Sequence, residues 1–150
     1  MKQIQIVAIG ILLVIGYSCN HVPGLSYSFS KAEYNEVAKC LLTNYNSVFQ
    51  EAGTKSTVVV YYSGFKENKF CQKAIFELLQ KQAVNTITFS RDSVISFSSK
   101  SKGTIKSIQS ILVYSNNKEK LIKKLTSVVK LKSVLGNGWY ELEEIDSIAN

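Results

Sequence analysis

VVKLKSVLGNGWYELEEI, residues 128–145, contains the strongest short turn signal in the chain. Asn137 and Gly138 form a pair that is preferred at the two central positions of a type I′ turn, where both residues need a positive φ. Strand-like residues, many of them apolar, flank this pair on both sides. The stretch therefore predicts a β-hairpin that turns at Asn137 and Gly138.

With these two residues in the turn, the register of the hairpin follows residue by residue. It places Leu135 opposite Tyr140, Ser133 opposite Leu142, Leu131 opposite Glu144, Val134 opposite Glu141, and Lys132 opposite Glu143. One side is then mainly apolar, and the other is charged and holds a cross-strand ion pair between Lys132 and Glu143. Such a hairpin packs one face on a core and leaves the other in water.

A second hairpin is expected near the middle of the chain. TITF (86–89) and VISF (94–97) flank the turn residues SRDS. In this segment Ile87, Phe89, Ile95 and Phe97 alternate with Thr86, Thr88, Ser96 and Ser98. The hydroxyls and Trp139 are expected on the water-facing side of the sheet. There they could hold a sugar or a peptide, or they could form an ordinary wet sheet face.

The remaining elements follow from hydrophobic periodicity. Ser30 and Glu33 form an S-x-x-E capping box, which predicts a first helix from about 31 to 50. The β-branched stretch STVVVYYS (56–63) predicts a strand that is buried on both faces. A second helix is expected near 68–82, a strand at 108–115, and a short helix within 116–127 whose Leu121, Ile122 and Leu125 face inward.

The order of elements is therefore α-β-α-β-β-β-α-β-β, in a single domain that spans residues 30–150. Antiparallel strands with one apolar face need cover on that face only. We predict an α+β two-layer sandwich, in which a mostly antiparallel sheet of about five or six strands carries two or three helices on one face.

The N-terminus has the pattern of a secretory signal. Lys2 precedes an apolar run from Ile4 to Ile15, which is shorter than the roughly 20 residues that a membrane-spanning helix needs. GYSC at 16–19 resembles the end of a bacterial lipoprotein signal, and this resemblance implies an acylated Cys19 and a place in the cell envelope. We expect a signal peptide at 1–18 and a lipidated tether at 19–29. Simple secretion and an uncleaved N-terminal anchor are the alternatives.

The charge of the chain is positive and unevenly distributed. The net charge is +7, and nine lysines but one acid, Glu119, lie between Lys100 and Lys132. Lys118, Lys120, Lys123 and Lys124 are the candidate contacts to anionic lipid, acidic glycan or an acidic protein, unless the stretch is simply a solvated surface. Arg91 is the single arginine, which argues against sequence-specific nucleic-acid recognition.

Side chains that commonly carry catalysis are scarce. The single histidine, His21, falls in the tether, which removes the usual general base, Ser-His and Cys-His pairs and histidine metal sites from the domain. Glu141, Glu143, Glu144 and Asp146 could bind calcium or form an acid–base pair, or they could line a solvated edge. We expect no catalytic residue, no cofactor and no metal.

Two cysteines remain if Cys19 carries a lipid. Cys40 and Cys71 could form a disulfide in an exported protein, because the two predicted helices flank one strand and should lie side by side. Cys71 is expected on the apolar face of the second helix, but the helical phase points Cys40 away from the apolar stripe of the first. Two free thiols are therefore the slightly favoured alternative.

Three functional hypotheses follow. The leading one is a lipid-anchored, non-enzymatic module that binds a protein or an anionic component of the cell envelope. The second is a carboxylate-dependent hydrolase of cell-wall or glycan material. The third is an inhibitor or immunity-type protein that occludes an acidic partner with its lysines.

Overall fold

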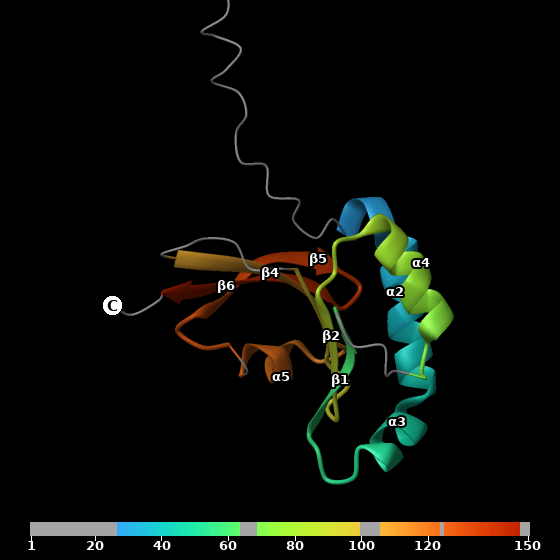
Figure 1. Cartoon of the computed structure of the whole chain (residues 1–150). Helices are drawn as coiled ribbons and strands as arrows, with labels where there is room; N and C mark the ends of the chain where they lie inside the picture. The colour runs from blue at the N-terminus through green and yellow to red at the C-terminus, as the bar shows by residue number, and fades with distance from the viewer. Residues whose placement is uncertain (1–26, 64–68, 100–105, 124, 148–150) are drawn as a thin grey trace, which may run out of the picture.

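The computed structural model describes residues 27–63, 69–99, 106–123 and 125–147. Within these ranges it has four helices, α2 (Tyr27–Thr43), α3 (Tyr45–Glu51), α4 (Gln72–Lys81) and α5 (Lys118–Ile122). The strands are β1 (Thr57–Tyr62), β2 (Thr86–Ser90), β3 (Ile95–Ser98), β4 (Lys106–Tyr114), β5 (Val129–Gly136) and β6 (Trp139–Ser147). The elements follow the predicted order, with the first helix divided in two (Figure 1).

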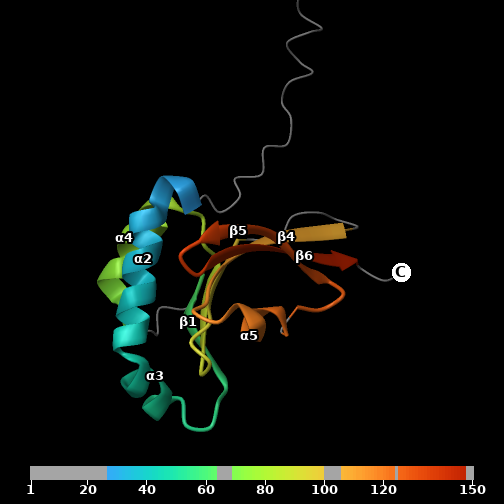
Figure 2. The ribbon, with the colours of Figure 1, turned by 180° about the vertical axis from the view of Figure 1, so that it is seen from behind.

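The strands form one antiparallel sheet in the order β1-β2-β3-β4-β6-β5. The helices α2, α3 and α4 lie on one side of it, and α5 lies on the other (Figures 1 and 2). The predicted α+β class is thereby confirmed, with a six-stranded sheet and three helices on one face. We call the opposite side the open face. The sequence predicted water over this whole face, but α5 covers part of it.

Apolar side chains gather in two clusters, one on each face of the sheet. The larger cluster includes Tyr34 and Leu41 of α2, together with Phe89 and Phe97. The smaller cluster lies on the open face and joins Val94, Val113, Leu121, Tyr140 and Leu142. Leu112 belongs to the first cluster and its neighbour Val113 to the second, because successive side chains of a strand point to opposite faces. The sheet is thus apolar on both sides where α5 covers it.

The middle hairpin forms as predicted. β2 and β3 pair with Ile87 opposite Phe97 and Thr88 opposite Ser96. The alternating apolar residues are fully buried: Ile87, Phe89, Ile95 and Phe97. Their hydroxyl-bearing neighbours Thr88, Ser96 and Ser98 reach the open face. Alternation along both strands therefore separates a core side from a hydroxyl side.

The last hairpin turns where the sequence predicts, but its register differs. Asn137 and Gly138 have φ angles of 52° and 81°, as a type I′ turn requires. Two register shifts along β5, between Leu131 and Ser133 and between Val134 and Gly136, then move the pairing. As a result, the partners are Leu131 with Leu142, Ser133 with Glu141 and Val134 with Tyr140. The predicted pairs beyond the turn, including Lys132 with Glu143, are therefore wrong.

The first helix begins earlier and breaks sooner than predicted. α2 starts at Tyr27, so Ser30 lies inside the helix and does not occupy the N-cap position of a capping box. The break falls at Asn44, whose side-chain amide donates to the carbonyl oxygen of Cys40 at 2.9 Å. A side chain that bonds the backbone in this way competes with regular helix geometry. The second part, α3, buries Val48 and Phe49.

The first strand and the second helix also depart from expectation. β1 lies at the edge of the sheet, and Val59 is 59% exposed, so this strand is not buried on both faces. A continuous β-branched run does not distinguish a central strand from an edge strand. α4 begins at Gln72, with Cys71 in front of it at a φ of 59°. Cys71 is therefore not on the apolar face of that helix, which buries Ile75 and Leu78.

Candidate binding face

The helix α5 divides its side chains between the protein and the solvent. Asn117 caps it, because its side-chain oxygen accepts from the backbone N–H of Lys120 at 2.9 Å. Leu121 is buried in the smaller apolar cluster, and Leu125 packs against that cluster. Ile122, which was predicted to face inward, is 47% exposed. Five residues make little more than one turn, so one leucine directed inward fixes which way the others point.

The lysines of α5 lie on its solvent side. Lys118 and Lys120 of α5 are exposed, and so is Lys123, which caps the C-terminus of the helix. Within the described residues, none of the three has an ion-pair partner, and Glu119 is the acid beside them. Lys124, the fourth lysine that the sequence suggested, falls outside the described residues. The structure thus gathers three of the candidate contacts on one short helix of the open face.

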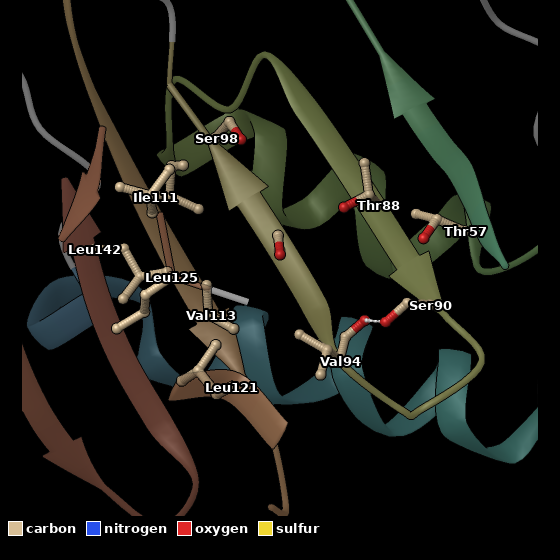
Figure 3. A pocket seen from close by; sticks show the side chains of 12 residues that line it. Thr57, Thr88, Ser90, Val94, Ser98, Ile111, Val113, Leu121, Leu125 and Leu142 are labelled. Carbon is tan, nitrogen blue, oxygen red and sulfur yellow. Dashed lines mark hydrogen bonds between the residues drawn. The ribbon is translucent and has the colours of Figure 1, made fainter. Parts of the chain in front are cut away.

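A groove runs over the open face next to α5, with a cavity volume of about 320 Å³. One half of its lining carries hydroxyls, from Thr57, Thr88, Ser90, Ser96 and Ser98 (Figure 3). The other half is aliphatic, from Val94, Ile111, Val113, Leu121, Leu125, Val129 and Leu142 (Figure 3). None of the described residues that line it is charged. Cavities of this size accept small molecules.

The hydroxyls of the groove differ in what they already bind. Ser90 donates to the carbonyl oxygen of Val94 at 3.1 Å and also bonds to the carboxylate of Asp92 (Figure 3 shows the first bond). The side chains of Thr57, Thr88, Ser96 and Ser98 make no hydrogen bond to another described residue. These four hydroxyls remain able to donate to a ligand and to accept from it.

Trp139 does not belong to the open face, contrary to the prediction. It is 1% exposed and packs in the larger cluster, with its ring centroid 5.2 Å from that of Tyr114 and 5.9 Å from that of Phe97. Its indole N–H donates to the side-chain oxygen of Asn35 on α2 at 2.9 Å. Trp139 lies on the helix side because side chains alternate along β6, and its neighbours Tyr140 and Leu142 belong to the smaller cluster on the open face. A sugar or peptide site built on this tryptophan is thereby excluded.

The carboxylates of β6 do not gather into a site. Glu141 accepts from Lys132 at 2.8 Å and from Ser133 at 2.9 Å, and this contact raises the pKa of the Lys132 ammonium. Glu143 and Glu144 are neighbours on a strand and point to opposite faces. The side chain of Asp146 falls outside the described residues. In the part of the chain that the structure describes, no group of three His, Cys, Asp or Glu side chains could hold a metal ion.

Cys40 and Cys71 form a disulfide, with their Cα atoms 5.9 Å apart. The bond connects α2 to the residue that precedes α4, 31 positions further along the chain. Cys40, whose helical phase points away from the apolar stripe of α2, has its partner in Cys71, the residue directly before α4. The bridge is thus part of the helix layer and lies on the other side of the sheet from the groove.

Sequence reasoning identified the lysines and part of the hydroxyl row but missed the groove. The aliphatic half draws on strands β4, β5 and β6 and on the segment around α5. One local indication of this half was present in the sequence: Leu121 and Leu125 were expected to face inward, which implies that the short helix covers a second apolar surface.

The comparisons add no relative: neither a family model, nor a curated protein, nor a solved structure matches this chain significantly. Among the described helices, none has both the length and the hydropathy required to cross a bilayer.

Proposed function

We propose that this chain is a lipid-anchored protein of the cell envelope, held by an acyl group on Cys19, and that its domain is a non-enzymatic module that binds an anionic envelope component. The lysines of α5 are the observation that carries the proposal. Lys118, Lys120 and Lys123 are exposed on α5 and its C-cap and have no carboxylate partner among the described residues. A cluster of unpaired lysines attracts anionic surfaces.

The lipid and the lysines would act together. A single acyl chain gives only marginal and reversible membrane binding, so stable anchoring needs a second signal. A lysine near an anionic membrane surface contributes about 1 kcal/mol. Three such lysines on α5 would therefore supply the second signal and would hold the open face towards the anionic surface.

Vesicle binding tests the lysines. A chain that starts at Asn20, and so lacks the lipid, is mixed with vesicles that contain anionic or only zwitterionic lipid. We expect binding to the anionic vesicles alone, and we expect the Lys118→Gln/Lys120→Gln/Lys123→Gln variant to bind roughly a hundredfold more weakly. Binding of the wild type should disappear within a few hundred millimolar salt, because surface charges are then screened.

The matched control moves the same charge change to the helix side. Lys39, Lys55 and Lys73 are also exposed, and they lie on or beside α2, α3 and α4. A Lys39→Gln/Lys55→Gln/Lys73→Gln variant has the same net charge as the α5 variant and should keep most of the binding. Equal losses in both variants would show that net charge matters and that α5 does not, which contradicts the proposal.

Cys19→Ala tests the anchor. The substitution should move the full chain out of the membrane fraction and abolish fatty-acid labelling. An unchanged distribution and unchanged labelling would show that Cys19 carries no lipid.

The inhibitor hypothesis uses the same lysines on an acidic protein. A pull-down from envelope extract at low and high salt distinguishes an acidic protein from an anionic lipid or glycan. A protein partner would be recovered in stoichiometric amounts with the wild-type chain and would be absent from the pull-down with the α5 variant. The hydrolase hypothesis is tested by a substrate panel. An activity that disappears in Glu141→Gln or Glu143→Gln would replace the proposal.

A further inference from the structure

The groove beside α5 offers a second and different kind of binding. Its aliphatic floor is formed by Val113, Leu121 and Leu142, each at most 5% exposed, and half-buried Ile111, Leu125 and Val129 surround it. Aliphatic side chains offer no hydrogen bond, so burying a polar group against them costs free energy. This half of the groove therefore accepts a hydrocarbon and disfavours a polar group.

The hydroxyl half has the opposite preference. Thr88 of β2 lies opposite Ser96 of β3, and Ser98 follows two residues later on the same face. None of these three hydroxyls bonds to a described residue, so all of them can bond to a ligand. Each can donate and accept, which suits a ligand group that also does both, such as an alcohol.

Charge narrows the class of ligand. No charged side chain lines the groove within the described residues, so a charged head there would be desolvated without an ionic partner. Ser90, which lines the hydroxyl half, is hydrogen-bonded to the carboxylate of Asp92. This carboxylate would repel an anion at the hydroxyl end. The lysines of α5 point to solvent beyond the aliphatic half and lie outside the lining.

We propose that the groove binds a single-chain amphiphile with an uncharged, hydroxyl-bearing head, whose chain lies on the aliphatic half and whose head lies on Thr88, Ser96 and Ser98. A volume of about 320 Å³ equals about ten water molecules of liquid, which suits a short chain of about eight carbons with part of its head. This site goes beyond the charge-driven docking of α5 and does not depend on it.

Photoaffinity labelling of the full chain in the membranes of expressing cells tests the site. The probe is a monooctanoylglycerol with a diazirine and an alkyne on its chain. The comparison probes carry the same chain with a carboxylate or an amine in place of the glycerol. We expect the glycerol probe to label peptides of β4, β6 and α5, which form the aliphatic half. Labelling should be competed by unlabelled monooctanoylglycerol and should be at least fivefold stronger than with either charged probe.

Variants of the hydroxyl half give an independent measure. One net hydrogen bond corresponds to a roughly three- to tenfold change in affinity. The Thr88→Val/Ser96→Ala variant should therefore lose labelling by roughly tenfold or more. Thr86→Val is the matched control, because Thr86 lies on the same strand and face but outside the lining of the groove, and its labelling should be unchanged.

Several results would overturn the inference. They are equal labelling by the carboxylate probe, labelled peptides mainly from α2 and α4, or unchanged labelling of the double variant. The comparison of probes and the peptide map use the wild-type chain, so they decide even if a variant folds poorly. Labelling is compared between probe mixed into the membranes and probe added to the medium. This comparison shows whether the amphiphile reaches the groove from the bilayer or from solution. Loss of vesicle binding in the α5 variant is a separate result, because those lysines do not line the groove.

Discussion

Reduction of the Cys40–Cys71 disulfide should destabilise the domain by an amount that follows from the chain length it closes. The two cysteines are 31 positions apart, and the bond connects α2 to the start of α4. In the chain-entropy model, a disulfide that closes a loop of this length stabilises the folded state by about 3.7 kcal/mol, because it restricts the conformational freedom of the unfolded chain. The free energy of unfolding should therefore fall by about that amount in Cys40→Ala/Cys71→Ala.

Urea unfolding of a chain that starts at Asn20 measures this difference. For an m value of about 1.5 kcal/mol per molar urea, the midpoint should fall by about 2.5 M. The reduced wild type should unfold at nearly the same urea concentration as the double variant, because both lack the bond. A thiol titration of the denatured, unreduced wild type should find no free thiol among Cys40 and Cys71.

A second variant separates the bond from the backbone at position 71. Cys71 has a φ of 59°, which costs an ordinary residue about 1 kcal/mol but costs glycine nothing. Cys40→Ala/Cys71→Gly should therefore be about 1 kcal/mol more stable than Cys40→Ala/Cys71→Ala. Two titratable thiols in the unreduced protein would show that the bridge is absent, and equal midpoints with and without reductant would show that it does not stabilise the domain.

Three further predictions concern single side-chain contacts between elements. Arg91 donates to the carbonyl oxygens of Lys55 (2.9 Å) and Gly53, and its guanidinium lies 4.8 Å from the ring centre of Phe49. Arg91→Ala should lower the free energy of unfolding by about 1–2 kcal/mol, with little recovery in Arg91→Lys because an ammonium lacks the planar fork; full recovery in urea unfolding would contradict this. Asn35→Ala should cost about 1–2 kcal/mol, because the buried indole N–H of Trp139 loses its acceptor. A double-mutant cycle with Trp139→Phe should show coupling, and strictly additive losses would contradict the bond. Glu33 bonds to Lys81, and this contact lowers the pKa of the Glu33 carboxyl. The pair therefore stabilises the fold above the unfolded pKa of Glu, about 4.3, and this contribution is lost as the pH falls through the lower folded pKa. The difference in melting temperature between wild type and Glu33→Gln should therefore shrink from pH 7 to pH 2.5, and a constant difference would contradict it.

Local patterns predicted most of the elements of this fold. The alternation of Ile87 and Phe89 with Thr86 and Thr88 was sufficient to place a strand and both of its faces. Asn137-Gly138 was sufficient to place the turn. The order of elements and the antiparallel sheet followed from these signals.

What local patterns missed depends on contacts between distant segments. The edge position of β1 is set by which strands pair, and its run of valines is the same at an edge or in the centre. Which side of β6 the helices cover decides that Trp139 lies in the larger cluster, where Asn35 of α2 binds it across 104 positions of sequence. The groove likewise joins β1 to β6 and α5, so no single segment shows it.

Hydrogen exchange in the presence of anionic vesicles decides whether α5 docks on the membrane, because it reports which face of the domain is covered. The exchange of an unlipidated chain is compared with and without vesicles at low salt. We expect slower exchange of backbone amides in and beside α5, at 115–123, with unchanged exchange in α2 and α4. Slower exchange on α2 and α4, or bound vesicles with no change at α5, would contradict it.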